Sequence, residues 1–355
     1  MSLLTEPLTG LLPPDVRQAF APTTTYLNTA TYGLAPTAAA EVVMGAERAR
    51  LEGRLDPPSI DDVVAACRSS FGRLVGVPAE RVAIGSQVSQ LVGVVAAALP
   101  AHALVLVPEG EFTSVLWPFL VRPDLTVRTM PLERLVEAID DRVDVVATSV
   151  VQSADGAVID PAVVTAAAHQ HGARVLLDVT QAAGWLPLDG CGAVDWVVGA
   201  GYKWLLAPRG TAFLAATPDA FELLRPTAAG WYAGYDPWAT CYGGPLRLAP
   251  DARRFDLSPV WSAWLGQQLA FDLLESVGVA AIHDHDVALA NRLRGGLGLP
   301  PARSAIVSVE APDGTAQRLA AAGIVASVRA GRLRLSCHLH NDIGDIDRAL
   351  DVLAG

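Results

Sequence analysis

One lysine stands out as a candidate catalytic residue. Lys203 lies in an apolar, glycine-flanked segment, residues 199–206 (GAGYKWLL), between two expected strands of a chain in which lysine is scarce. Burial disfavours the charged form of an amine, and a lowered pKa is what a Schiff-base lysine needs. The alternative is a lysine whose stem packs on apolar neighbours while its charge reaches water. The segment alone supports both interpretations equally.

A carboxylate upstream favours the catalytic interpretation. Asp178 ends the apolar run 174–178 (RVLLD), and Gln181 follows three residues later. A pyridoxal phosphate cofactor needs such a carboxylate to keep its ring nitrogen protonated, so that the ring can act as an electron sink. A helix cap after the strand is the common alternative. The pairing of Asp178 with Lys203, at the ends of successive strands, weakens that alternative.

The elements that must position these residues are alternating strands and helices. Continuous apolar strands favour a mostly parallel sheet covered on both faces, which binds ligands at the carboxyl ends of its strands. The expected strands are Arg81–Ile84, Leu104–Pro108, Leu125–Met130, Val143–Ser149, Arg174–Asp178, Val194–Val198 and Thr211–Ala215. The expected helices include Pro36–Leu51, Gln87–Ala98 and Pro161–His171.

The pattern of residue types changes after about residue 226. An aromatic segment precedes two helical stretches, two strand-like runs and a closing helix, which together indicate a smaller α+β unit. The helices are expected at Trp261–Ser276, Asp284–Arg294 and Ile343–Leu353, and the strands at Ala305–Glu310 and Arg332–Cys337. We therefore expect an α/β fold with a large domain over residues 20–228. A small domain is expected over residues 229–355, and residues 1–19 are expected to belong to this small domain.

Composition excludes several classes of protein. The 355 residues are 51% hydrophobic and 18% charged, which excludes a disordered chain and predicts a large core. A net charge of −11 argues against nucleic acid as a partner. The four scattered cysteines and the absence of a leader-like start indicate the cytoplasm. The uncharged stretch Leu91–Pro108, broken by Pro100, is expected to be a buried helix and strand, so no membrane partner is predicted.

Three motifs resemble the class V aminotransferase family of fold-type-I pyridoxal-phosphate enzymes. They are residues 178–184 (DVTQAAG), 194–196 (VDW) and 201–205 (GYKWL). Residues 26–30 (YLNTA) are similar to the family's opening segment, and residues 332–341 (RLRLSCHLHN) to its closing one. The resemblance implies that Lys203 forms the internal aldimine and that Asp178 binds the pyridine nitrogen. It also implies that Gln181 binds the phenolic oxygen, with Gln152 or Ser153.

The same resemblance assigns the rest of the cofactor site. Ser86, Gln87, Val88 and Ser89 lie between a strand and a helix, where free amides and hydroxyls suit a phosphate. Tyr202 resembles the kynureninase tyrosine that reaches the phosphate. Phe112 falls where the family stacks a ring on the cofactor, although an ordinary core phenylalanine is the competing interpretation.

For an amino-acid substrate, the resemblance assigns Asn28 and the carboxylate-binding Arg334, whose planar fork suits a bidentate contact. Residues 229–242 and 252–261 look like the ergothioneine-biosynthetic C–S lyase branch, which cleaves hercynylcysteine sulfoxide. A trimethylammonium substrate is recognised by aromatic faces. A substrate cage and a packed interface are equally good interpretations of the four rings there, which belong to Trp231, Tyr232, Tyr235 and Trp238.

The expected reaction is a β-elimination that yields ergothioneine, pyruvate and ammonia. A kynureninase-like hydrolase, an aminotransferase and an epimerase on the same scaffold are the alternatives, and a non-enzymatic regulator is disfavoured by the retained Lys203 and Asp178. A cysteine desulfurase is disfavoured because residues 315–328 contain no cysteine, although Cys241 stays a small alternative.

The resemblance also implies a homodimer with shared active sites, in which Ser258 offers its hydroxyl to the partner's phosphate. Two histidine pairs, at 283 and 285 and at 338 and 340, are expected to be exposed or helix-terminal residues rather than metal ligands.

Overall fold

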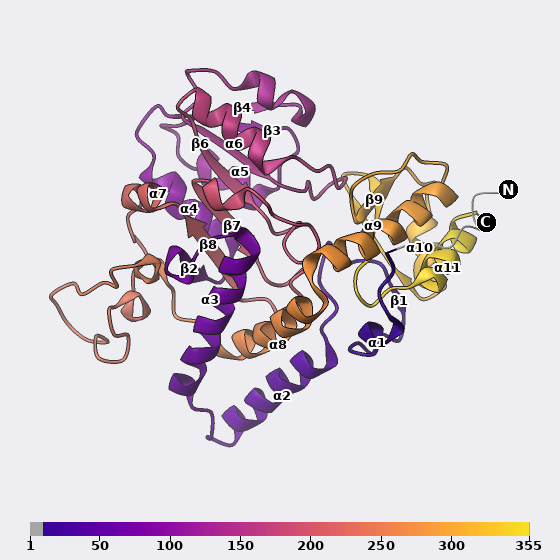
Figure 1. The fold of residues 1–355 in the computed structure, drawn as a ribbon, viewed down its shortest axis with the longest axis horizontal. Coiled ribbons are helices and arrows are strands. Elements are labelled where there is room, and N and C mark those ends of the chain that lie inside the picture. Colours follow the sequence, from indigo (N-terminus) through magenta and orange to yellow (C-terminus); the bar gives the residue numbers. More distant parts are fainter. Residues whose placement is uncertain (1–9, 355) are drawn as a thin grey trace.

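The computed structural model describes residues 10–354, and its centre is a seven-stranded sheet in the order β2-β8-β7-β6-β5-β3-β4 (Figure 1). Residues 1–9 and 355, which the sequence assigns to the small domain, lie outside the described residues. The strands of the sheet are β2 (Val82–Gly85), β3 (Leu104–Pro108), β4 (Thr126–Met130), β5 (Val145–Ser149), β6 (Arg174–Asp178), β7 (Trp196–Ala200) and β8 (Ala212–Ala216). Each expected strand is present, within two residues of its predicted ends.

One strand of this sheet runs against the others. β8 is antiparallel to both β7 and β2, whereas the remaining neighbours are parallel. A parallel connection needs a crossover of a dozen or more residues, and only residues 201–211 join β7 to β8. The chain therefore turns back at the carboxyl edge, and the turn carries Lys203 on that edge.

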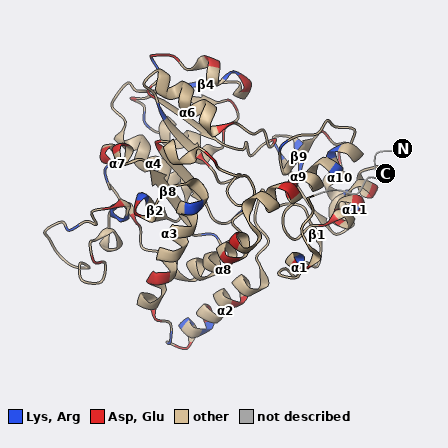
Figure 2. Ribbon diagram, in the orientation of Figure 1, with Lys and Arg blue, Asp and Glu red and all other residues tan. Residues whose placement is uncertain are grey.

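Helices cover both faces of the sheet, as the uncharged strands predict. Residues alternate along each strand, so that Val82 and Ile84 join one core while Ala83 joins the other. The first core contains α3 (Asp61–Val75), α6 (Pro161–Gln170) and α8 (Trp261–Val277), and the second contains α4 (Val88–Ala98), α5 (Thr113–Leu120) and α7 (Pro218–Leu223). The long helix α2 (Thr37–Leu51) packs along α8. Figure 2 shows charged residues on outer helices such as α2 and α11.

The smaller unit lies at one side of the large one in Figure 1 and has its own core around Leu289, Val307 and Leu333. Its antiparallel sheet has the order β11-β12-β9, and β1 from the start of the chain pairs with β10. The elements are α1 (Pro14–Arg17), β1 (Thr25–Tyr26), α9 (Val279–Gly296), β9 (Ile306–Val309), α10 (Thr315–Ala321), β10 (Ile324–Val325), β11 (Ser327–Arg329), β12 (Arg332–Ser336) and α11 (Ile343–Ala354).

Short 3₁₀ turns complete the described elements. They are η1 (Pro57–Ile60), η2 (Ala79–Arg81), η3 (Leu132–Arg134), η4 (Val136–Ala138), η5 (Cys191–Ala193), η6 (Trp231–Ala233) and η7 (Ala252–Phe255). The uncharged stretch Leu91–Pro108 forms most of α4 and then β3, as expected. Within residues 10–354, every helix is too short or too polar to cross a membrane.

A buried ion pair fastens the segment before α8 to the sheet. Arg68 on α3 lies 2.6 Å from Asp256, and the two side chains are 8% and 1% exposed. Asp256 also accepts a hydrogen bond from the Ile84 amide at 2.8 Å, and Arg68 donates to the Val82 carbonyl. Residues 256–260 are therefore held against β2, beside the start of α4.

We predict that Asp256→Ala lowers the free energy of unfolding by about 3–5 kcal/mol, because it leaves the Arg68 charge buried without a partner. Urea unfolding of the purified protein measures this. Glu47→Ala, which breaks the exposed Arg50–Glu47 pair, is the control and should cost below about 1 kcal/mol. The double variant Arg68→Met/Asp256→Leu should recover most of the loss; equal losses for the double and single variants would contradict the assignment.

Candidate active site

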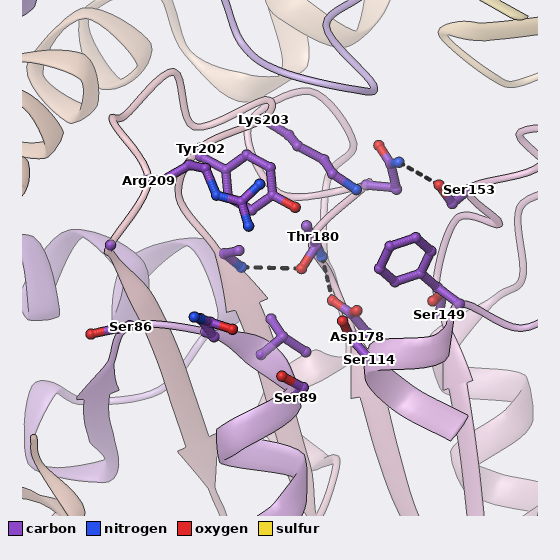
Figure 3. Close-up of a pocket in the computed structure, with 16 residues that line it drawn as sticks. Ser86, Ser89, Ser114, Ser149, Ser153, Asp178, Thr180, Tyr202, Lys203 and Arg209 are labelled. Carbon is purple, nitrogen blue, oxygen red and sulfur yellow. Dashed lines mark hydrogen bonds between the residues drawn. The ribbon is translucent and has the colours of Figure 1, made fainter. Parts of the chain in front are cut away.

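A cavity opens at the carboxyl edge of the sheet, where β6 and β7 end beside the start of α4 (Figure 3). Its empty volume is about 550 Å³, which includes open solvent at its mouth. It is lined by Ser86, Gln87, Val88, Ser89, Phe112, Ser114, Ser149, Ser153, Asp178, Thr180, Gln181, Ala200, Tyr202, Lys203, Arg209 and Gly210. Most of the sequence-predicted cofactor residues therefore meet in one place.

Lys203 is the only lysine of the sequence. Its side chain is 5% exposed and forms no ion pair with a described residue, and Figure 3 shows its amine directed into the cavity. Burial lowers the pKa of Lys203 to about 8. A β-carbon on Gly33 would overlap the Lys203 carbonyl, and one on Gly184, at φ +107°, would overlap the Trp204 carbonyl. Glycines thus let the backbone close tightly around the lysine.

Asp178 faces the same cavity from the end of β6. One carboxylate oxygen accepts the Thr180 amide at 2.7 Å, and no basic side chain pairs with the carboxylate among the described residues. Burial raises the pKa of Asp178 to about 6, and the nearby Glu111 carboxylate also raises it. A buried carboxylate of this kind gains from a cationic N–H placed against its free oxygen.

The start of α4 forms the other end of the cavity. The first turn of this helix has no side-chain cap, so its amides are free to bind an anion, and Ser86 and Ser89 stand beside it. Across the cavity the Arg209 guanidinium lies 4.4 Å from the Tyr202 ring centroid. Burial raises the pKa of Tyr202, so the phenol stays a neutral donor. Sequence reasoning missed Arg209, although it lies in the same segment as Lys203.

Phe112 lines the cavity and is not a core residue. Its side chain is 42% exposed, and the Lys203 amine lies 5.2 Å from the ring centroid. This position excludes the alternative of ordinary core packing and leaves the ring beside the space above Asp178.

Gln181 and Ser153 lie on the cavity wall as expected, whereas Gln152 does not. The Gln181 amide donates to Ser153 Oγ and to the Ala30 carbonyl, each at 3.0 Å. The side chain of Gln152 donates to Glu111 at 2.9 Å and is turned away from the cavity. Glu111, which sequence reasoning missed, is 5% exposed and also accepts the Ser149 amide and hydroxyl. Gln152 thus serves a buried network around Glu111.

Arg334 lies behind this wall, outside the cavity lining. Its side chain is 1% exposed, donates to Ser153 and to Thr31, and forms no ion pair with a described carboxylate. Its Nε has no hydrogen-bond partner, and neither has the buried Oδ1 of Asn28. Burial and the neighbouring Arg329 lower the pKa of Arg334 to about 10. An unpaired buried guanidinium is stabilised by an anion.

The four aromatic residues assigned to substrate do not line the cavity of their own chain. Tyr232 and Trp238 instead donate to the two oxygens of Asp61, each at 2.7 Å, and Trp231 packs against Trp238 with ring centroids 4.9 Å apart. Tyr235 is 67% exposed. The segment between α7 and α8 that carries them projects from the large unit at the left of Figure 1. A cage around the substrate of the same chain is therefore not formed.

Ser258 and the histidine pairs complete the comparison with the sequence. Ser258 is exposed and lies next to the end of β2, outside the cavity lining.

The expectation of exposed or helix-terminal histidines is wrong for His285, His338 and His340, which are all buried because α9 and the end of β12 pack against each other. Over residues 10–354, no group of histidine, cysteine and carboxylate side chains is arranged to hold a metal.

The donor set fits pyridoxal phosphate. An amine with a lowered pKa suits its aldehyde, a buried carboxylate suits its ring nitrogen, and free helix amides with Arg209 suit its phosphate. Asp178 and Lys203 both face the cavity without pairing to each other or to another described residue. The unpaired amine and the unpaired carboxylate therefore match the aldehyde and the ring nitrogen of the expected cofactor.

The comparisons with known proteins agree with this assignment. The family model for aminotransferase class-V matches residues 94–324. An isopenicillin N epimerase of Streptomyces clavuligerus is 29% identical, over 96% of this chain and 97% of its own length. A kynureninase of Deinococcus radiodurans is 30% identical, over 68% of this chain and 60% of its own length.

Solved structures show the same fold. A complex of the cystine C–S lyase C-DES with its product cysteine persulfide has a TM-score of 0.84 at 23% identity, covering 94% of this chain and 97% of its own. The cysteine desulfurase CsdA of Escherichia coli has a TM-score of 0.82 at 18% identity, covering 97% and 98%. The architecture is that of fold-type-I pyridoxal-phosphate enzymes, as the sequence predicts.

We predict that loading of pyridoxal phosphate onto the apo-protein speeds up as pH rises through about 8, and not through the usual lysine value near 10.5. Attack on the aldehyde needs the neutral amine. Because burial lowers the pKa of Lys203, this amine becomes neutral at a lower pH than an exposed lysine does. Stopped-flow absorbance at pH 6–10 measures the rate. Borohydride reduction followed by peptide mapping should place one pyridoxyl group on Lys203, and Lys203→Arg should retain none. A midpoint near 10.5 would contradict the prediction.

Proposed function

Because the chain belongs to the class V aminotransferase family of pyridoxal-phosphate enzymes, we propose that it is a carbon–sulfur lyase acting on a cysteine S-conjugate. The observation that carries the proposal is a buried, unpaired Arg334 beside a cavity with a single amine base. Arg334 supplies a partner for the carboxylate of an amino acid, and Lys203 supplies a base for its α-carbon.

Each residue of the chain that faces the cofactor has a separate role in the proposed reaction. When bound, pyridoxal phosphate supplies an electron sink for the electrons of the broken bond. Asp178 would hold the protonated ring nitrogen of the cofactor, and Lys203 Nζ would remove the α-proton of the substrate. Phe112 covers one side of the cavity and limits water. The carbon–sulfur bond then breaks, and sulfur leaves with the bonding electrons, so no separate acid is needed.

The cysteines support elimination over persulfide chemistry. Cys67, Cys191 and Cys337 are buried outside the cavity, and burial raises the pKa of each thiol. Cys241 lies in the projecting segment and donates to the Pro237 carbonyl. No cysteine therefore lines the site of its own chain, whereas a desulfurase needs a thiolate at the substrate sulfur.

For the substrate itself we propose hercynylcysteine sulfoxide, with pyruvate, ammonia and a sulfenic acid as products. A thiol reductant then converts the sulfenic acid to ergothioneine. The proposal rests on the resemblance of residues 229–242 and 252–261 to the ergothioneine C–S lyase branch. Since the aromatic rings do not reach their own cavity, we propose a homodimer in which this exposed segment reaches the partner's site, as does Ser258.

An epimerase is the second candidate, because the isopenicillin N epimerase similarity spans nearly the whole of both chains. Epimerisation needs a proton delivered to the opposite side of the α-carbon. Lys203 is the only amine of the cavity lining, and the described residues that line it place no second amine there. The single base favours a reaction that removes a proton from one face.

We predict pyruvate release from cysteine S-conjugate sulfoxides, measured by coupled lactate dehydrogenase. Lys203→Arg should abolish release, because the guanidinium neither links to the cofactor nor acts as a base. Arg334→Leu should raise KM about tenfold or more, from loss of a charge-assisted pair. Chiral chromatography of the same mixtures separates the candidates: inversion of the α-carbon without pyruvate would overturn the lyase and support the epimerase.

A second prediction addresses substrate choice. Cation–π contacts are worth roughly 0.5–2 kcal/mol, so Trp238→Leu should lower the preference for a trimethylated over an unmethylated sulfoxide about two- to thirtyfold. Light scattering confirms that the variant is still a dimer, and Trp117→Leu, another exposed tryptophan, is the matched control. Retention of the full preference by Trp238→Leu would remove the aromatic segment from the substrate site.

A further inference from the structure

A buried histidine joins the small unit to the loop that carries the catalytic lysine. His338 follows β12, and its partner Asp286 lies on α9; both side chains are 0% exposed. His338 Nδ1 lies 2.8 Å from Asp286 Oδ2, and Nε2 lies 3.1 Å from the carbonyl oxygen of Trp204. Trp204 is the residue that follows Lys203.

Both partners of the imidazole are acceptors. A backbone carbonyl has no hydrogen to donate, and neither has an ionised carboxylate. With Asp286 ionised, the ring makes both hydrogen bonds only if both of its nitrogens carry a proton. Asp286 forms no other ion pair with a described residue, so its charge balances that of the ring. We propose that His338 is an imidazolium held between Asp286 and the Trp204 carbonyl, and that it is a positioning residue for Lys203.

The groups around His338 support a single charge at this ring. His285 and Asp286 of α9, and Cys337 and His340 from the end of β12, are the titratable groups that face it or its carboxylate partner. Burial lowers the pKa of His285 and lowers that of His340 to about 3, so both stay neutral. His340 has one acceptor, the Tyr26 carbonyl, and its Nδ1 has no partner. One proton suffices there, whereas His338 needs two.

The carbonyl that His338 binds belongs to a tightly held residue. Trp204 is 0% exposed, its indole donates to Gln181 at 2.8 Å, and its ring lies 5.5 Å from Trp185 and edge-on to His338. His338 thus links α9 to the peptide next to Lys203, and through Trp204 to Gln181 on the cavity wall. The role rests on the proposed function only in taking Lys203 as the cofactor-linked base.

Nitrogen NMR of the histidine-labelled holoenzyme at pH 7.5 tests the charge directly. His338, assigned by the signal missing in His338→Phe, should show two protonated ring nitrogens. Asp286→Asn should convert it to the neutral ring with the proton on Nε2, because the amide can donate to Nδ1. A bare Nδ1 in the wild-type protein would overturn the imidazolium.

The pH midpoint of the holoenzyme's visible absorbance tests whether the charge balance of this pair acts on Lys203. His338→Phe leaves the Asp286 charge uncompensated, which favours a cationic group nearby, so the midpoint should rise by roughly half a unit. Asp286→Asn keeps the Nε2 donor and adds no net charge, so it should leave the midpoint nearly unchanged.

His340→Phe is the matched control, since it removes a buried histidine that contacts the first strand and not the Lys203 loop. It should leave the midpoint unmoved and lower Tm less than His338→Phe, which leaves the buried Asp286 carboxylate without a partner. Equal midpoints for the two variants would reduce His338 to a structural residue. None of these readouts uses a substrate, so failure of the pyruvate assay would leave them intact, and their failure would leave the lyase proposal standing.

Discussion

Lys203 and Asp178 are both taken out of water at the carboxyl edge of one sheet, and burial moves both pKa values toward neutrality. Each charge would be costly to bury alone. The fold separates them across a cavity instead of letting them neutralise each other, which leaves both groups available to a third molecule. The antiparallel turn between β7 and β8, the glycines around the lysine and the amides of α4 all serve this one arrangement.

The small unit contributes side chains to the site and to the loop beside it. Arg334 reaches the cavity wall from β12, and His338 reaches the lysine loop from the residues just beyond it. Two contacts four residues apart therefore tie both the carboxylate site and the base to the same short stretch of chain. A shift of this stretch would move the substrate anchor and the loop next to the base together.

Much of this site could be predicted from the sequence, because the end of a buried strand can be recognised where an apolar run stops at a polar residue. An apolar run that stops at Asp178, and another that stops before Lys203, are expected to end at the same edge of a parallel sheet, and here their strands β6 and β7 are neighbours. Glu111, Thr180 and the orientation of Gln152 could not be found this way. The burial of Glu111 depends on amides of β5 that lie far away in the chain. The prediction for the three buried histidines was wrong for the same reason. Their polar side chains favour an exposed position, and they are buried only because α9 packs against the residues after β12.

Of the 26 lysine and arginine side chains of this protein, only Lys203 is a lysine. Reagents that acylate amines, such as succinimidyl esters, or that cross-link them, such as formaldehyde, therefore find Lys203 as their only side-chain amine. Since that amine is buried in the cavity, cofactor would shield it. Labelling at Lys203, counted by peptide mapping so that the α-amine of the chain is left out, thus reports how much of a preparation has lost its cofactor.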